Sequence, residues 1–193
     1  ASPELGRSAL DALELMSVGV QYMREHMPMQ ARVHSAIIKT GGVSPNVIQD
    51  HAEALYLIRS PDLADVRALF ERVKKIAEGA ALMTETAVTC EIDKACSSLL
   101  PNHVLDRLLQ DQRLRLDSAH FDAQDHAFAH DIQATLTPQD IAACYKMYGA
   151  PKPERAPALF EGVLPLPPEK LLLPGSTDVA DASWKAQLSQ CFA

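Results

Sequence analysis

A glycine-rich loop carries the first residues whose types suit binding chemistry. Positions 41–46 read Gly-Gly-Val-Ser-Pro-Asn. Paired glycines let a backbone adopt positive φ and approach another group closely, and an exposed Asn46 amide can donate and accept hydrogen bonds at once. An ordinary hairpin connection explains the same residues, although 40–51 is long for that purpose. The loop is therefore a candidate binding loop, with Gly41, Gly42 and Asn46 as its candidate residues.

Arg59 is a candidate for binding an anion. It ends the otherwise apolar run Leu-Tyr-Leu-Ile-Arg. A guanidinium at a strand end can bind a carboxylate through two parallel hydrogen bonds. The competing interpretation is an arginine that lies in solvent or in an ordinary ion pair. The residue type and its position leave both interpretations open.

Three histidines form a weaker candidate for a metal site. His126 and His130 are four residues apart, which places them on one face of a helix, and His120 precedes them. Such spacing can hold a divalent metal with help from Asp122 or Asp125. The glutamate of an H-E-x-x-H motif is absent, so exposed histidines on a polar helix face are the simpler interpretation. We therefore assign no metal ligand from the sequence.

A short polar run near the end of the chain is the last candidate. Ser176, Thr177 and Asp178 follow a proline-rich stretch. Small and acidic residues of this kind form turns, and they also form active-site loops. The run is therefore noted as a possible active-site loop.

The composition excludes several classes of function. The chain has 193 residues, 47% of them hydrophobic, with a net charge of −7. An acidic surface disfavours nucleic acid and anionic membranes as partners, and no apolar run approaches the ~20 residues that span a bilayer. The four cysteines form no C-x-x-C pair, and esterase, P-loop and dinucleotide motifs are absent. We expect a cytoplasmic protein that binds neither nucleic acid nor membrane.

The first half of the chain predicts the elements that position these residues. Apolar residues at spacings of three and four, or in alternation, indicate helices and strands respectively. The expected order is helix, strand, strand, helix, strand, over about 8–26, 31–39, 52–60, 62–80 and 86–93. This order is one strand short of the ferredoxin-like βαββαβ motif. The chain is therefore expected to start inside a domain.

The second half predicts a different organisation. Pro101 can open a helix that runs to Leu116, and another helix is expected over about 122–135. Seven prolines fall within 151–174, which predicts a loop or linker. We expect an α+β protein with two domains, residues 1–95 and 96–193.

Five stretches together resemble a known family. They are SPELGRSALDALELM, GGVSPNVIQDHAEALYLIRSP, RVKKIAEGAALMTET, DKACSSLLPN and GSTDVADASW. They are similar to metal-dependent amidohydrolases of the aminoacylase and glutamate-carboxypeptidase type, the family that includes the aminobenzoyl-glutamate hydrolases. The resemblance covers most of 1–115 and 174–193 and is weakest over 116–173.

The resemblance implies a fold and an activity. Residues 1–95 match a ferredoxin-like dimerisation domain that lacks its first strand, and 96–193 match part of an α/β metallopeptidase catalytic domain. In this family the dimerisation domain lends residues to the active site of a partner. The positions that contact substrate match Asn46 and Arg59, the arginine being associated with a free carboxylate. The expected activity is hydrolysis of the amide bond of an aminoacyl-glutamate such as p-aminobenzoyl-glutamate.

The sequence also departs from the family pattern. Zinc or manganese is expected for the family, bound mainly by a Gly-His-x-x-x-His-type motif and a Glu-Glu pair. Neither motif occurs in this sequence. No catalytic or metal-binding residue is therefore assigned. The expected partner is a second copy or a related subunit, and the alternative function is a non-catalytic dimerisation or binding module that pairs with another subunit.

Overall fold

The computed structural model describes residues 2–116, 120–150, 153, 156–166, 172 and 175–191. The chain divides into two compact units, Ala1–Ser98 and Leu99–Ala193. Among the helices in the described ranges, none is long and apolar enough to cross a membrane. The predicted α+β class is confirmed, because a small antiparallel sheet and several helices are both present.

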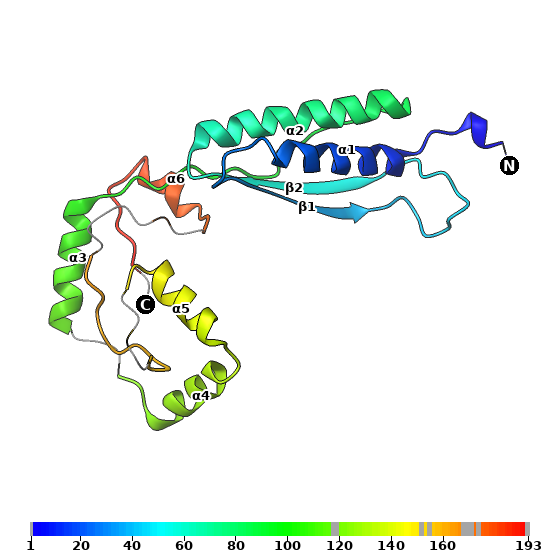
Figure 1. Cartoon of the computed structure of the whole chain (residues 1–193). Helices are drawn as coiled ribbons and strands as arrows, with labels where there is room; N and C mark the ends of the chain where they lie inside the picture. The colour runs from blue at the N-terminus through cyan, green and yellow to red at the C-terminus, as the bar shows by residue number, and fades with distance from the viewer. Residues whose placement is uncertain are drawn as a thin grey trace. The chain divides into compact units, whose positions relative to one another are not determined.

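The first unit is a β-hairpin covered by two helices. Strands β1 (Arg32–Lys39) and β2 (Glu53–Arg59) pair antiparallel. Helices α1 (Ala9–Arg24) and α2 (Leu63–Thr84) pack together along one face of this hairpin (Figure 1). A short 3-10 helix, Pro3–Leu5, precedes them. The core between helices and sheet contains Val20, Met23, Ala31, Val33, Leu69 and Val73.

Both helices begin where the sequence places a capping residue. The Ser8 hydroxyl accepts a hydrogen bond from the backbone N–H of Asp11, and Asp62 accepts one from Ala64. These bonds satisfy donors that the first turn of a helix leaves unpaired. Helix α2 ends when Glu85 adopts a left-handed conformation with φ of 55°. The predicted helices at 8–26 and 62–80 are therefore confirmed, and α2 extends slightly further.

Helices α1 and α2 approach each other closely at a glycine. A Cβ atom at Gly19 would lie 2.6 Å from Ile76 Cγ2. Real Cβ atoms do not come so near a neighbour, so the missing side chain is what allows this contact. The contact holds the helical layer together above the hairpin.

The predicted third strand at 86–93 is wrong. In the described part of the chain the sheet has two strands, and residues 86–93 belong to neither. Val88 and Ile92 remain 43% and 66% exposed. Alternating side chains indicate an extended backbone, but a strand also needs a neighbouring backbone with which to exchange hydrogen bonds. The ferredoxin-like arrangement is therefore not confirmed.

The second unit is helical in its described residues. Its helices are α3 (His103–Leu116), α4 (Ala123–Gln133), α5 (Pro138–Met147) and α6 (Val179–Ser183). Helices α3 and α4 confirm the helices predicted from Pro101 to Leu116 and over about 122–135, whereas α5 and α6 were not predicted. Only 153, 156–166 and 172 of the proline-rich stretch are described, and these have no regular secondary structure. Pro151, Pro167, Pro168 and Pro174 lie outside the described residues.

Candidate substrate-binding hairpin

The loop between β1 and β2 takes its shape from two glycines. Gly41 has φ of 83° and Gly42 has φ of 147°. A Cβ atom at Gly41 would overlap the carbonyl oxygen of His51, across the base of the loop. The backbone there is therefore both left-handed and too crowded for any side chain. The Thr40 hydroxyl donates to the Gly42 carbonyl at 3.1 Å and holds the turn.

Charged side chains close the base of the loop. Glu53 Oε1 lies 2.7 Å from His51 Nε2 and 3.0 Å from Lys39 Nζ. The hydrogen bonds from His51 and then Lys39 hold the pKa of Glu53 below its ordinary value of 4.5. The carboxylate thus joins the end of β1 to the start of β2 across a register shift between Ile37 and Lys39.

The far side of the loop is attached to the start of α1. The backbone N–H of Ala9 donates to the Gln49 carbonyl at 2.8 Å, and Ser8 Oγ donates to Gln49 Oε1 at 3.3 Å. A Cβ atom at Gly6 would overlap Ile48 Cδ1, so Ile48 occupies the space that this glycine leaves. The loop is therefore held at positions 48 and 49 as well as at its base.

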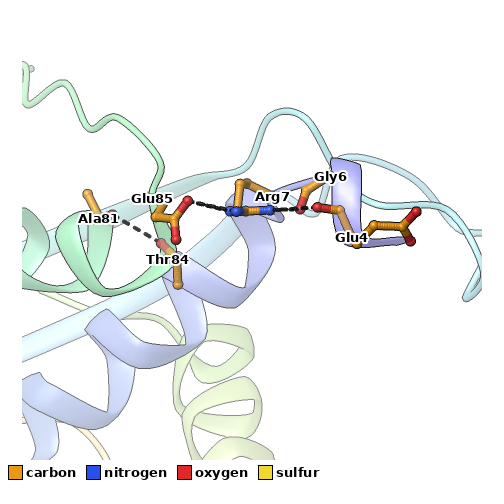
Figure 2. A network of polar contacts seen from close by, with 6 residues as sticks. All are labelled: Glu4, Gly6, Arg7, Ala81, Thr84 and Glu85. Carbon is orange, nitrogen blue, oxygen red and sulfur yellow. Dashed lines mark hydrogen bonds and ion pairs between the residues drawn. The ribbon is translucent and has the colours of Figure 1, made fainter. Parts of the chain in front are cut away.

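The segment that contains Gly6 is itself tied to α2 (Figure 2). Arg7 Nε donates to Glu85 Oε2 at 2.8 Å, and Arg7 Nη1 donates to the Gly6 carbonyl at 2.9 Å. The Thr84 hydroxyl donates to the Ala81 carbonyl at 3.3 Å and completes the end of the helix. This network connects the loop, the start of α1 and the end of α2.

Asn46 lies at the tip of the loop. It is exposed and sits in a turn that the Val47 N–H closes by donating to the Ser44 carbonyl at 3.2 Å. Within the described ranges, no hydrogen bond to its side chain is formed. The amide is thus available to a ligand or to a partner chain.

Arg59 lies at the other end of the hairpin. It is half-buried at the end of β2, directly opposite Arg32 at the start of β1. From Glu53 to Arg59 the strand takes six steps, which at ~3.3 Å per residue amounts to roughly 20 Å. The loop that carries Asn46 leaves the hairpin beyond Glu53, at the end where the N-terminus lies (Figure 1). Asn46 and Arg59 of one chain are therefore not brought together.

The histidine candidates do not form a metal centre in the structure. His126 Nε2 lies 3.2 Å from Glu161 Oε1. Asp122 and Asp125 form the capping box that starts α4. The carboxylate of each residue accepts a hydrogen bond from the backbone N–H of the other. Their carboxylates are therefore occupied by the helix terminus. His130 is an exposed residue in the last turn of α4, and His120 is exposed in the segment before it.

The polar run near the chain end initiates α6. The backbone N–H of Val179 donates to Thr177 Oγ1 at 3.3 Å, and Thr177 Oγ1 donates to Asp178 Oδ1 at 3.4 Å. Ser176 lies just before this turn and is exposed. These three residues therefore act locally in the structure, and a role in an active-site loop stays a prediction.

One contact in the second unit was missed by the sequence interpretation. The buried Ser183 hydroxyl accepts the Leu100 N–H at 2.8 Å and donates to the Ala180 carbonyl at 2.5 Å. Asp106 Oδ1 accepts the Ser189 hydroxyl at 2.6 Å nearby. The chain end is thus fixed to the start of α3. No short-range pattern signals a contact between residues 83 positions apart.

Comparison of the sequence with known proteins first finds similarity to dipeptidases. No protein-family model matches the chain. It is 34% identical to the Xaa-Arg dipeptidase of Mus musculus over 54% of this chain, and 35% identical to that of Homo sapiens over 45%. These matches cover 24% and 20% of the dipeptidases. The chain is thus similar to these dipeptidases over about half of its own length.

A more extensive match identifies a particular relative. The chain is 46% identical to a subunit of the p-aminobenzoyl-glutamate hydrolase of Escherichia coli (strain K12), over 99% of its own residues. The resemblance noted in the sequence is thereby confirmed. The chain spans 42% of the length of that relative.

Proposed function

We propose that this chain is part of a metal-dependent amidohydrolase that cleaves the amide bond of an aminoacyl-glutamate such as p-aminobenzoyl-glutamate. The observation that carries the proposal is the 46% identity to the aminobenzoyl-glutamate hydrolase along 99% of the chain. In this proposal residues 1–95 form the dimerisation domain and residues 96–193 form part of the catalytic domain. The reaction adds water across the amide bond, giving a carboxylate and the free amine of glutamate.

The described residues do not supply the metal centre. Among them, no group of three or more His, Cys, Asp or Glu side chains comes together to hold a metal ion. The proposed zinc or manganese therefore requires ligands other than these, and we assign no catalytic step to the described side chains. What this chain contributes to the reaction in our proposal is substrate binding.

Arg59 and Asn46 have separate parts in that binding. The Arg59 guanidinium binds the free α-carboxylate of the substrate through two parallel hydrogen bonds. The exposed Asn46 amide donates to, or accepts from, polar atoms of the substrate. Because the two residues lie at opposite ends of one hairpin, one substrate meets Arg59 of one copy and Asn46 of another. The proposal therefore requires a dimer.

The experiment that tests the function is a direct assay. The complete hydrolase, which contains this chain together with the metal ligands, is incubated with p-aminobenzoyl-glutamate and zinc or manganese, and release of p-aminobenzoate is followed. We expect turnover that a chelator abolishes and that added metal restores. A dipeptide with C-terminal arginine serves as the comparison substrate, given the dipeptidase relatives. Faster turnover of that dipeptide than of the glutamate substrate would contradict the proposed substrate class.

A second candidate function is a non-catalytic module that pairs with a related subunit. The observation that favours it is the name of the relative, which is one subunit of its hydrolase. The two candidates differ in bound metal. A purified complex in which the metal copurifies only with the partner supports the module, whereas stoichiometric metal in the protein without a partner supports the enzyme. Cytoplasmic location and the lack of nucleic-acid or membrane partners stay predictions.

A further inference from the structure

A groove lies between α1 and α2 in the first unit. It has a volume of about 350 Å³, which falls in the lower part of the range found for pockets that hold small molecules. Gly19 and Met23 of α1 and Ile76 of α2 line it with apolar surface. Met23 is buried and Ile76 is half-buried, so packing holds both side chains in place as an apolar floor. The groove is therefore suited to an apolar body.

Arg72 lines the same groove with a guanidinium whose position is fixed. Its Nη1 donates to the backbone carbonyl of His26 at 2.8 Å, just beyond the end of α1. Within the part of the chain that the structure describes, its Nε and Nη2 form no hydrogen bond. A carboxylate accepts two parallel hydrogen bonds from such a pair of guanidinium donors. Arg72 can therefore hold the end of α1 and bind an anion at the same time.

The charge of the groove is positive and is not balanced nearby. Lys75 lies one turn beyond Arg72 and also lines the groove. Among the described residues, neither side chain forms an ion pair with a carboxylate, and Glu71, four positions before Lys75, is no exception. The described lining residues include no Asp or Glu. In a chain with a net charge of −7, this groove therefore favours an anionic ligand.

Tyr22 adds an aromatic wall to the groove. Its side chain lines the groove and is 67% exposed, which is unusual for a large ring beside apolar neighbours. Aromatic rings pack against one another in offset or edge-to-face arrangements, and the thioether of Met23 makes favourable contacts with a ring edge. A cation such as Arg72 or Lys75 is also attracted to the face of a ring. An aromatic body therefore fits this lining better than an aliphatic one.

We propose that the groove between α1 and α2 is a binding site for a small aromatic monocarboxylate. The carboxylate accepts two hydrogen bonds from Arg72 and is attracted by Lys75. The ring lies over Met23 and Ile76 and packs against Tyr22. A ligand bound in this way contacts both helices, so it stabilises their packing in proportion to its affinity and concentration.

The test is a titration of the complete protein, labelled with ¹³C at the methionine methyl groups, in which the NMR signal of Met23 is followed. Benzoate is the probe, and we expect saturable binding with a Kd of about 1 mM. Benzamide has the same ring without the charge, and acetate has the charge without the ring. Each should bind at least about tenfold more weakly than benzoate, because each lacks one half of the recognition.

Four variants locate the binding in the groove. Arg72→Gln should weaken benzoate binding about ten- to a hundredfold, and Lys75→Gln about two- to fivefold, as expected for an exposed charge. Tyr22→Ala should weaken benzoate and leave acetate unchanged. Lys74→Gln is the matched control, because Lys74 is an exposed lysine on the same helix that is not among the lining residues; it should change neither ligand.

Several results would overturn the site. They are a Met23 signal that benzoate does not move, equal binding of benzoate and benzamide, and equal losses in Lys74→Gln and Lys75→Gln. Arg72→Gln also removes the bond to His26 and can disturb α1. Lys75→Gln and Tyr22→Ala alter exposed side chains, so they test the site without that complication. Binding in the groove requires neither metal nor turnover, and its outcome is independent of the proposed function.

Discussion

Asn46 and Arg59 belong to the same hairpin and lie at its opposite ends. Asn46 is in the loop that joins Lys39 to Glu53, and Arg59 is the last residue of the strand that begins at Glu53. A small substrate cannot reach both residues of one chain when roughly 20 Å of strand separates them. Two copies related by a two-fold axis can bring one Asn46 and one Arg59 to each of two equivalent sites.

Mixed dimers of two inactive variants should therefore regain activity. A dimer of one Asn46→Ala chain and one Arg59→Ala chain contains one site with both natural residues and one site with neither. Random mixing in equal amounts should restore about a quarter of the natural activity, because about half of the dimers are mixed and half of their sites are intact. The measurement is kcat of the complete hydrolase assembled from the co-expressed variants, with p-aminobenzoyl-glutamate as the substrate.

The control for this complementation is a third variant that carries both substitutions. Asn46→Ala mixed with the Asn46→Ala/Arg59→Ala chain leaves no site with both natural residues. No recovery is expected in that mixture. Recovery there would show that activity does not require Asn46. Failure to recover in the first mixture, while each variant still dimerises, would show that the two residues act within one copy.

Gly41 should tolerate no side chain. Gly41→Ala adds a Cβ atom in a left-handed conformation and against the His51 carbonyl, and we expect a loss of about 1–3 kcal/mol in the free energy of unfolding. Gly79→Ala is the matched comparison, since a Cβ atom on that helical glycine meets nothing within 4 Å. It should gain about 0.5–1 kcal/mol. Urea unfolding measures both, and a loss in Gly79→Ala as large as that in Gly41→Ala would contradict the steric argument.

Ser8 should stabilise both a helix and the loop. Ser8→Ala removes the cap of α1 and the contact with Gln49, with an expected cost of about 1 kcal/mol from the cap alone. Ser8→Asp restores the cap and should recover that part of the stability. Amide hydrogen exchange at Ala9 and in the loop reports the second contact. Exchange that is unchanged in Ser8→Ala would show that Gln49 holds the loop through its backbone carbonyl alone.

Glu53 should titrate below pH 4.5. Hydrogen bonds from His51 and Lys39 lower its pKa from the ordinary 4.5, so they stabilise the folded form above pH 4.5. That stabilisation is lost as pH falls through the depressed pKa. The Glu53 side-chain carbon signal in NMR gives the midpoint directly. In His51→Gln the midpoint should rise toward 4.5, and a midpoint above 4.5 in the natural protein would contradict the geometry at the loop base.

The chain should associate with itself in solution. Strand β1 pairs only with β2 among the described residues, so its other edge presents unpaired backbone groups to a second chain. Leu55 and Leu57 are also more than half exposed on the sheet face away from the helices. Sedimentation velocity at micromolar concentration should show a dimer or a larger species. The double variant Leu55→Lys/Leu57→Lys separates the two causes of association. It removes the apolar sheet face and leaves the backbone edge of β1 intact.

Prediction from the sequence succeeded where the signal was local. Ser8 and Asp62 cap the helices that their positions indicated, and alternation located both strands of the hairpin. Helix α5 was missed although Thr137 and Asp140 form a capping box at its start. The strand at 86–93 failed because pairing depends on a neighbour that alternation does not reveal.

The candidate site was predictable only in part. The loop and Arg59 stood out by residue type, and their roles in binding stay predictions. The pairing of Arg32 with Arg59 has no local signal, because it depends on the register that joins residues 27 positions apart. The Leu100–Ser183 contact likewise requires the three-dimensional structure. Long-range pairing, rather than local propensity, is what the sequence interpretation lacked.

The left-handed conformation of Glu85 has a practical consequence for engineering. Glycine at a helix terminus of this kind usually raises the melting temperature, since it removes the steric cost of a side chain at positive φ. At this position the same replacement would also release Arg7, and with it the segment whose Gly6 receives Ile48. Replacing Glu85 with glycine would therefore raise the melting temperature and at the same time loosen the loop. A stabilised variant chosen by melting temperature alone would be selected for a looser binding loop.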